Sequence, residues 1–285
     1  MSNTSEGAIQ FYAVVVIYNT SISDSDTINR LRIIKGHQIE IIAVDNSTRD
    51  YSNEAICRES GWTYISMYGN AGLSKAYNKA LDYICTKKSG IVVWFDDDTE
   101  VTQEYFDTLE LDICKYQDVD VFAPMIRGQD GRFWSPNSYR YIRNKQIKKP
   151  TDNIPNEKFN AINSCTAVRT SVYEDYRYTE KLFLDQVDHQ FFEDQREKGT
   201  NFRKLNIIIN HNFSTRSNME SIEKVKIRYG IMIPDFLVFC NKSKGRYFLG
   251  WIKIFGWGIR ETIKYKNLSF FTWCIKTALN ESKKL

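Results

Sequence analysis

The sequence lacks the features that identify a secreted, disulfide-stapled or membrane-spanning protein. Its first ten residues, MSNTSEGAIQ, are polar and acidic, whereas a secretory signal begins basic and continues apolar. No uninterrupted apolar run reaches the roughly 20 residues that a membrane-spanning helix needs. The six cysteines form no CxxC pair and no zinc-ribbon spacing, so we expect reduced and mostly buried thiols. These absences predict a cytoplasmic protein.

The composition is that of a folded globular chain. Hydrophobic residues make up 42% and charged residues 26% of the 285 residues, which excludes a disordered or fibrous protein. Charge is uneven, because residues 216–285 hold 14 Lys and Arg against 5 Asp and Glu, while residues 1–215 hold 25 against 30. We therefore expect one domain over 1–215 and a basic extension over 216–285. Such an extension suits an anionic partner, either membrane lipid or nucleic acid.

Apolar, β-branched segments alternate with helical patterns in the first half of the chain. Strands are predicted at 10–18, 39–45, 62–67 and 90–96, and this alternation is typical of an α/β fold with a mostly parallel sheet covered on both faces. Ligands of such sheets bind beyond the carboxyl ends of the strands. We expect those ends to converge on one crevice, and they carry Tyr18, Asp45, Asn46, Asn70, Asp96, Asp97 and Asp98.

The second half of the chain is less regular. Residues 127–156 are polar and basic, with Gly and Pro, and are predicted to form an extended insertion. A helix is predicted over 182–199, ended by Gly199. The segment NIIINH then predicts a strand that ends at His211.

The acidic triplet follows a buried strand, where like charges repel each other. If the strand continues, Asp96 and Asp98 project to one side and Asp97 to the other. Two carboxylates aimed at one point suit Mn²⁺ or Mg²⁺, which binds one or two protein carboxylates together with substrate phosphates. The alternative is an acidic turn that caps the next helix.

Several motifs, in order, resemble the family 2 glycosyltransferases of GT-A fold, especially their bacterial rhamnosyltransferase-like branch. The resemblance covers roughly residues 10–215 and is carried by VVVIYN, AVDNST, NAGLSKAYNKAL, VVWFDDDTEV and the stretch from NSCTAVRT to DQREKG. It implies a Rossmann-like, mostly parallel sheet flanked by helices, here followed by a helical, basic and aromatic extension. It also implies an inverting, metal-dependent hexosyltransferase that uses a nucleoside-diphosphate sugar.

The resemblance assigns roles to individual residues. It implies that the donor binds near Tyr18, Asp45 and Asn46, with Asp45 accepting a hydrogen bond from the base. Asp96 is then near the ribose, Asp98 binds the metal, and a metal-ligating histidine corresponds to His211. The donor-binding set further includes Asp97 and the residues that match the family's N-x-G-x-x-x-A-x-N stretch, namely Asn70, Gly72 and Asn78.

Inverting transfer needs one carboxylate that takes the proton of the acceptor hydroxyl. The resemblance places this base at Asp188, although Val187 stands where the common pattern has Glu, and Asp185 remains a rival. The pair Glu193-Asp194 is interpreted as a solvated helix face. His189 and Glu193 have the spacing of a zinc pair, but no further ligands stand at a known spacing.

The extension combines bulky aromatic residues with Lys and Arg over 246–273, which suits a helix in the lipid headgroup region. A small helical subdomain with its aromatic residues packed inward is the alternative, and both can hold at once. A peripheral site on the cytoplasmic face of the inner membrane would suit a lipid-linked glycan acceptor in O-antigen, capsule or wall polysaccharide synthesis. The donor is then dTDP-rhamnose or a UDP-hexose.

Two other functions fit part of the pattern. A nucleotidyltransferase also uses a parallel sheet and a carboxylate-bound metal, but it needs a Gly-rich basic loop after the first strand, which YNTSISDSDT does not provide. A nucleic-acid-binding protein would use the basic extension, but the acidic remainder opposes polyanion binding. We therefore expect no nucleic-acid partner.

Overall fold

The computed structural model describes residues 8–211 and 221–285. Its strands form one eight-stranded sheet and one small three-stranded sheet. The strands are β1 (Gln10–Ile17), β2 (Gln38–Asp45), β3 (Thr63–Ser66), β4 (Ile91–Asp96), β5 (Val121–Gly128), β6 (Phe133–Ser135), β7 (Asn137–Ser138), β8 (Lys145–Gln146), β9 (Phe159–Asn160), β10 (Ala167–Arg169) and β11 (Phe202–His211).

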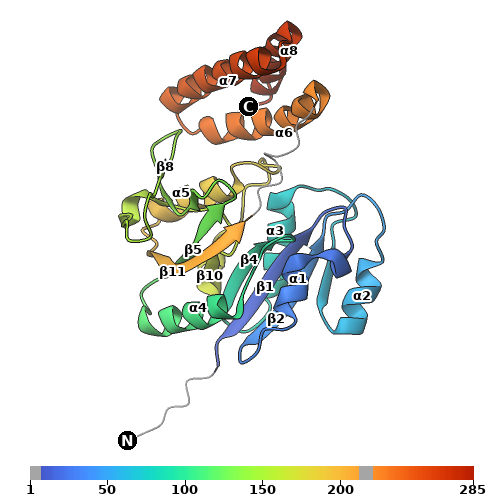
Figure 1. The fold of residues 1–285 in the computed structure, drawn as a ribbon, viewed down its shortest axis with the longest axis vertical. Coiled ribbons are helices and arrows are strands. Elements are labelled where there is room, and N and C mark those ends of the chain that lie inside the picture. The colour runs from blue at the N-terminus through green and yellow to red at the C-terminus, as the bar shows by residue number, and fades with distance from the viewer. Residues whose placement is uncertain (1–7, 212–220) are drawn as a thin grey trace, which may run out of the picture.

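Helices flank this sheet and form a separate layer at the C-terminal end (Figure 1). The helices are α1 (Asp26–Leu31), α2 (Asn53–Ser60), α3 (Leu73–Ile84), α4 (Gln103–Lys115), α5 (Val187–Glu197), α6 (Ile222–Cys240), α7 (Lys244–Tyr265) and α8 (Leu268–Ser282). The sequence-based α/β class with a helical extension is thus confirmed.

The order of the strands brings distant parts of the chain to one edge. The path is β11-β5-β10-β4-β1-β2-β3, with β1, β2, β3 and β4 parallel, and β10 antiparallel to both β4 and β5. Because β10 runs against both of its neighbours, β5 and β11 run the same way as β4. His211, the last residue of β11, therefore lies at the same sheet edge as Asp45 and Asp96.

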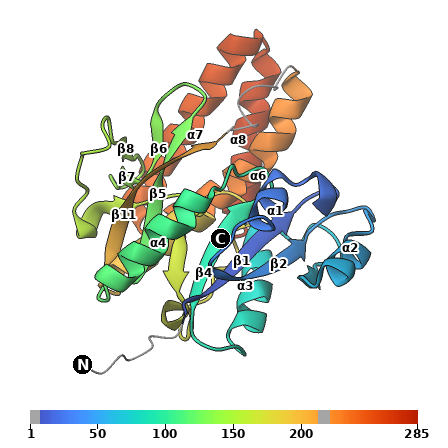
Figure 2. The same cartoon turned by 60° about the horizontal axis from the view of Figure 1, so that its bottom comes forward.

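Both faces of the sheet are buried, as the continuous apolar strands predict. Alternate residues of β1 belong to different cores: Phe11 and Val15 pack with α1, α2 and α4, whereas Tyr12 and Val14 pack with α3 and α5. Figure 2 shows the strands from another side, with the C-terminal helices beyond them. The cores fix the central strands, so their carboxyl ends have a defined geometry.

The C-terminal helices α6, α7 and α8 have a hydrophobic core of their own, around Ile233, Phe236, Ile254 and Phe270. Of the aromatic residues in the extension, some pack inward, such as Phe270, while Phe248 is 66% exposed. The packed helical subdomain is thus present, and contact of the exposed residues with a lipid surface stays a prediction. None of the helices within residues 8–211 and 221–285 is long and apolar enough to cross a bilayer. The expected boundary at residue 215 lies outside the described residues.

One predicted helix is longer than the helix in the structure. The helix expected over 182–199 begins only at Val187, because residues 182–186 form an irregular segment in which Gln186 has a left-handed φ of 65°. The insertion at 127–156 contains the short strands β6, β7 and β8, of which β7 and β8 form a small sheet with β9. Cys57, Cys165, Cys240 and Cys274 are buried, as expected, while Cys85 and Cys114 are exposed.

Candidate active site

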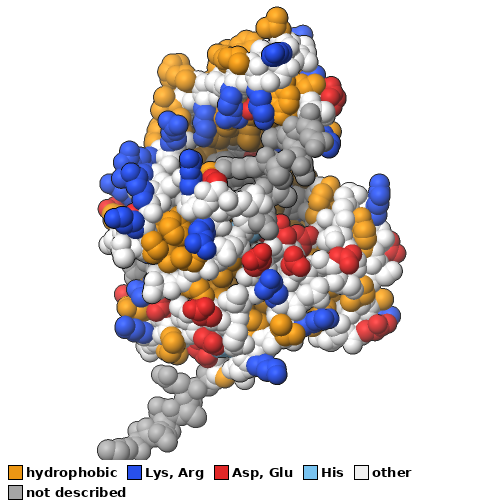
Figure 3. Space-filling model, in the orientation of Figure 1, with side chains coloured by type: hydrophobic (Ala, Val, Ile, Leu, Met, Phe, Trp, Pro, Cys, Tyr) orange, Lys and Arg blue, Asp and Glu red, His pale blue; other side chains and the backbone are white. Residues whose placement is uncertain are grey.

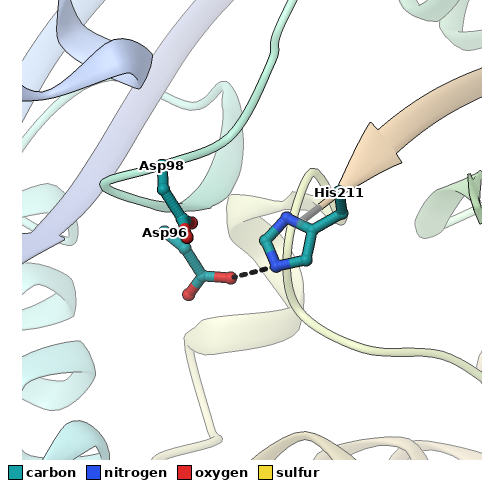
Figure 4. Close-up of side chains that lie close together, drawn as sticks. All are labelled: Asp96, Asp98 and His211. Carbon is teal, nitrogen blue, oxygen red and sulfur yellow. Dashed lines mark ion pairs between the residues drawn. The ribbon is translucent and has the colours of Figure 1, made fainter. Parts of the chain in front are cut away.

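Asp96, Asp98 and His211 meet at the carboxyl edge of the sheet (Figure 4). Asp96 ends β4, beside Val16 of β1, and His211 reaches it from the end of β11. One ligand atom of each residue lies within 4.8 Å of those of the other two, and His211 Nε2 is 4.0 Å from Asp96 Oδ2. The sequence placed these residues at strand ends, and the structure brings them together.

The protein environment raises the pKa of two carboxylates in the crevice, Asp96 and Asp97. Burial raises the pKa of Asp96, with Asp98 adding to the rise and His211 opposing it. The Asp96 side chain keeps 48% of its surface accessible and lines a pocket. Burial raises the pKa of Asp97 to about 6, and Asp98 and Asp96 contribute to this rise. A bound cation would reverse the cost of holding these charges together.

The donor set fits a divalent cation. Carboxylate oxygens are the ligands that Mg²⁺ and Mn²⁺ prefer, and a histidine nitrogen is a common further ligand. Opposite ligands of an octahedral ion with bonds of about 2.1 Å lie about 4.2 Å apart. Adjacent ligands lie only about 3.0 Å apart, so ligand atoms that all lie within 4.8 Å of one another would have to move closer to bind one ion. It is the only such group of His, Cys, Asp and Glu within the described parts of the chain.

Asp188 lines the same pocket as Asp96. The pocket has a volume of about 220 Å³ and lies between the end of β4, the loop before β10 and the start of α5. Asp188 stands in the first turn of α5, where its Oδ1 accepts a hydrogen bond of 2.7 Å from the His189 amide. Its Oδ2 accepts none from the residues that the structure describes. An acid with an unengaged oxygen facing a pocket is suited to take up a proton.

Asp185, the rival base, is held by an arginine. Arg228 of α6 donates to both of its carboxylate oxygens, at 2.5 and 2.6 Å. The Asp185 carboxylate correspondingly raises the pKa of Arg228. A carboxylate in a bidentate ion pair is a poor proton acceptor, because protonation would break the pair. Asp185 is thus engaged within the fold, and the assignment of the base to Asp188 stays a prediction.

The residues expected to contact the nucleotide line up along the ends of β1 and β2. Tyr18 is 50% exposed, whereas Asp45 is only 8% exposed. Asp45 Oδ2 accepts hydrogen bonds from Asn53 and Tyr64, at 2.9 and 3.2 Å, and its Oδ1 accepts one from the Ser47 amide. Asp45 thus orders the turn after β2. Its contact with a nucleobase stays a prediction.

Asn46 and Asn70 form a hydrogen-bonded pair that shapes the loop into α3. Asn46 Nδ2 donates to Asn70 Oδ1 at 3.1 Å, and Asn46 Oδ1 accepts from the Ala71 amide at 2.8 Å. Asn70 Oδ1 also accepts from the Gly72 amide. These amides hold the loop shape at the crevice rim, and direct contact with a donor stays a prediction for both.

Gly72 and Asn78 contact protein rather than open space. A Cβ on Gly72 would lie 2.8 Å from the ring and carbonyl of Phe183, and the φ of Gly72 is +93°. Asn78 donates to the Tyr178 carbonyl and accepts from the Tyr178 amide, both at 2.9 Å. The close approach that the glycine permits is thus to Phe183, and Asn78 fixes the segment before it. Both residues are engaged in contacts within the protein, and their contact with the nucleotide sugar stays a prediction.

The interpretation of Glu193 as part of a solvated helix face is wrong. Glu193 is 5% exposed and pairs at 2.5 Å with Arg246, which lies in the first turn of α7. Its partner in the proposed zinc pair, His189, instead contacts Asn160 Nδ2 through Nδ1 at 3.1 Å. Asp194 is less buried and accepts from Gln190 and Tyr176. The helix face is an internal contact.

Sequence reasoning missed several residues of the pocket. Tyr77 on α3 is buried beside Asp96 and Asp188, and burial together with these two acids raises its pKa, so it stays a protonated donor. Ser164 lowers the pKa of Asp96 by hydrogen bonding. The segment NSCT contains Ser164, but its role could not be separated from strand packing. Arg228 and Asp235 lie in a helix whose contact with the loop before α5 left no sequence signal.

Comparisons with known proteins agree with this architecture. The Glycosyl transferase family 2 model matches residues 12–177. A dTDP-rhamnosyl transferase, RfbF of Shigella flexneri, is 23% identical over 183 residues, which are 63% of this chain and 61% of that protein. The match thus spans less than two thirds of that relative's length.

Solved structures share the fold at low identity. S. aureus TarS 1-349 in complex with UDP-GlcNAc has a TM-score of 0.51 at 15% identity, with 80% of this chain and 67% of that chain covered. The mannosyltransferase PcManGT from Pyrobaculum calidifontis, in complex with GDP-Man and Mn²⁺, has a TM-score of 0.56 at 12% identity, with 97% and 88% covered. Since the family model covers more than half of the chain, the protein belongs to glycosyltransferase family 2.

Proposed function

We propose that the protein is an inverting, metal-dependent glycosyltransferase that moves rhamnose or another hexose from a nucleoside-diphosphate sugar to a glycan acceptor. The observation that carries this proposal is the shared position of Asp96: it belongs both to the acid–histidine cluster and to the pocket that Asp188 lines. The proposed cation site and the proposed base would thus border one space. Family membership supports glycosyl transfer over the nucleotidyltransferase and nucleic-acid alternatives.

The chain's own residues account for the proton and for orientation. Asp188 takes the proton of the acceptor hydroxyl as that oxygen bonds to the anomeric carbon, and the bond from this carbon to the diphosphate breaks on the opposite face. Asp96, Asp98 and His211 would hold Mn²⁺ or Mg²⁺, which neutralises charge on the leaving diphosphate. Tyr77 lines the pocket that Asp96 and Asp188 share.

The donor is proposed to be dTDP-rhamnose or a UDP-sugar. RfbF is named as a dTDP-rhamnosyl transferase, and TarS was solved with UDP-GlcNAc. The space beside Tyr18, Asp45 and Asn46 would receive the base and ribose, because these residues follow the ends of β1 and β2 next to Asp96 and Asp97. Selectivity for the sugar would then depend on the pocket between Tyr77 and Asp188.

A screen of nucleotide sugars tests this function. The purified chain is heated with dTDP-rhamnose, UDP-GlcNAc, UDP-glucose or GDP-mannose, with and without Mn²⁺. A true donor should raise the unfolding temperature only when the metal is present, because ligand binding to the folded state stabilises it by mass action. Release of the nucleoside diphosphate on addition of a glycan acceptor should follow. Equal shifts with and without metal, or none with any donor, would contradict the proposal.

The acceptor is proposed to be a lipid-linked glycan, reached through peripheral contact with the cytoplasmic face of the inner membrane. Exposed apolar side chains repeat every three or four residues along α7, and we name them the α7 stripe: Phe248, Ile252, Phe255, Ile259 and Ile263. Figure 3 shows apolar side chains at the outer edge of the C-terminal helices, with a row of Lys and Arg beside them. Apolar residues flanked by cations suit an anionic lipid surface.

Sedimentation with vesicles tests membrane contact. The wild-type chain should sediment with vesicles that contain phosphatidylglycerol and much less with phosphatidylcholine alone, and salt should weaken the binding. Replacing Phe248 and Ile259 by Ser should reduce the bound fraction severalfold. Leu111 is a matched control, because it is 72% exposed on α4, and Leu111→Ser should bind as wild type. Equal loss in both variants, or equal binding to both vesicles, would contradict the membrane contact.

A further inference from the structure

Residues 182–186 form the irregular segment that leads directly into Asp188, and α3 holds one side of it. The hydroxyl of Ser74 donates to the Leu182 carbonyl at 2.6 Å, and the Leu73 amide donates to the Phe183 carbonyl at 2.6 Å. Gly72 lets Phe183 approach this closely, since any side chain there would overlap it. The carbonyls of the segment are therefore fixed to the first turn of α3.

Helix α6 holds the other side of the segment through Asp235. Its Oδ1 accepts a hydrogen bond of 2.8 Å from the Phe183 amide, and its Oδ2 accepts from the Leu184 and Asp185 amides at 2.8 and 2.7 Å. Asp235 is 1% exposed, and burial raises its pKa although the three amides oppose this. A buried carboxylate is costly unless it is hydrogen-bonded, so three successive amides indicate a structure built around this one acid.

Arg228 lies two helical turns before Asp235, on the same face of α6. Its guanidinium donates to both oxygens of Asp185. Helix α6 therefore contacts the segment with one anion, Asp235, and one cation, Arg228. The anion binds the backbone amides, and the cation binds the only carboxylate within 182–186. The segment then enters α5 through Gln186, whose left-handed backbone sets the direction of the helix that carries Asp188.

We propose that Asp235 and Arg228 are positioning residues for sugar transfer, which act by holding segment 182–186 so that Asp188 faces the pocket that Asp96 lines. This inference rests on the proposed function, because it takes Asp188 as the base. A base works only within hydrogen-bond reach of the proton it removes, and a displacement of about 1 Å can cost about 100-fold in rate. Helix α6 would therefore help to position the base, in addition to any membrane contact of the C-terminal extension.

Asp235→Asn tests the inference, with Glu261→Gln as the matched control. Both side chains are buried acids of the C-terminal helices, at 1% and 4% exposure, but Glu261 pairs with Arg260 and Tyr229 away from the segment. The side-chain amide that Asp235→Asn introduces cannot accept from all three backbone N–H groups. We expect kcat to fall about 10- to 100-fold with donor affinity within about twofold of wild type. Glu261→Gln should keep the wild-type kcat, and an equal kcat in the two variants overturns the inference.

A double variant separates positioning from general stability. If Asp235 acts through the base, adding Asp235→Asn to Asp188→Asn should lower kcat no further, because the group being positioned is already gone. Multiplied losses overturn the inference. If Asp235→Asn does not fold, Arg228→Lys replaces it, since lysine keeps the charge but loses the bidentate contact; a kcat loss of about 10-fold is expected, and wild-type kcat overturns the inference.

Hydrogen exchange gives a readout that does not need turnover. The amides of residues 183–185 should exchange faster in Asp235→Asn and remain slow in Glu261→Gln. Unchanged exchange in Asp235→Asn overturns the inference. A wild-type chain that binds and transfers no nucleotide sugar overturns the proposed function, whereas normal wild-type turnover with an unaffected Asp235→Asn overturns only the positioning role.

Discussion

The acids at the sheet edge and the acids that face the C-terminal helices differ in the partners that balance their charge. In the crevice, no Lys or Arg of the described residues forms an ion pair with Asp96, Asp97, Asp98 or Asp188. Next to the helices, Asp185 pairs with Arg228 and Glu193 pairs with Arg246. Asp235, which forms no ion pair within residues 8–211 and 221–285, instead accepts hydrogen bonds from three backbone amides.

The contrast distinguishes carboxylates that have partners within the protein from carboxylates whose charge a ligand would balance. A buried acid that serves structure needs an internal partner, because an unpaired charge is expensive away from water. The crevice carboxylates are instead close to one another, and burial raises the pKa of Asp96 and Asp97. Holding such carboxylates close together destabilises the fold without a ligand, and a bound cation would remove this destabilisation. Acid content alone would not reveal the difference, since both regions are rich in carboxylates.

The largest expected effect breaks the crevice side of this comparison at its base. Asp188→Asn keeps the shape of the side chain but cannot take a proton at neutral pH, so kcat should fall by about 10³-fold or more. Donor affinity should change little, because Asp188 would not hold the nucleotide. Calorimetric titration with the donor and steady-state turnover measure the two quantities separately. Retained turnover would assign the base to another residue.

The metal side of the crevice should give the next largest effect. Asp98→Asn removes a charged ligand, and we expect Mn²⁺-dependent affinity for the nucleoside diphosphate to fall by about 100-fold, with little change in the metal-free affinity. Calorimetry with and without Mn²⁺ gives both values. His211→Asn should weaken the same dependence less, since the two carboxylates remain. Metal-dependent affinity equal to wild type in Asp98→Asn would exclude the cation site.

Much of the sheet edge could be predicted because it depends on local pattern. The apolar runs that end in Tyr18, Asp45 and Asp96 identify buried parallel strands, and parallel strands bring such ends together. His211 was found only through the family resemblance, because its distance from Asp96 in the sequence hides their proximity. The antiparallel β10, which keeps β11 in the same direction as β4, is too short to give an alternating pattern.

The contacts of the C-terminal helices could not be predicted, because they pair charges that are far apart in the chain. Nothing near Glu193 indicates that Arg246 neutralises it, and a polar helix face is interpreted as solvated when no partner is visible. Likewise Asp235 stands in an apolar helix, and only the folded structure shows that it accepts hydrogen bonds from backbone amides. The helix expected over 182–199 was too long for the same reason: long-range contacts hold residues 182–186 out of the helix.

The stabilisation that the buried ion pair Glu193–Arg246 gives the fold should depend on pH. Burial raises the pKa of Glu193, but Arg246 and Lys242 outweigh it and hold the pKa below the ordinary 4.5. The ion pair thus stabilises the fold above pH 4.5 and loses its effect as the pH falls through the lower folded value. Glu193→Gln should cost about 3 kcal/mol at pH 7, with the difference from wild type shrinking below pH 4.5. A difference independent of pH, measured by urea unfolding, would contradict this account.

The smallest expected effect sharpens the comparison within one ion-pair network. Lys242 reaches Glu193 at 3.1 Å and Glu197 at 2.6 Å, but its side chain is 35% exposed, whereas Arg246 is nearly buried. An exposed pair is weakened by water and salt, so Lys242→Ala should lower the free energy of unfolding by less than about 1 kcal/mol. In about 0.5 M NaCl the loss should shrink further, while the cost of Glu193→Gln should persist. Equal costs for the two variants would mean that burial does not decide which acid pairs stabilise this fold.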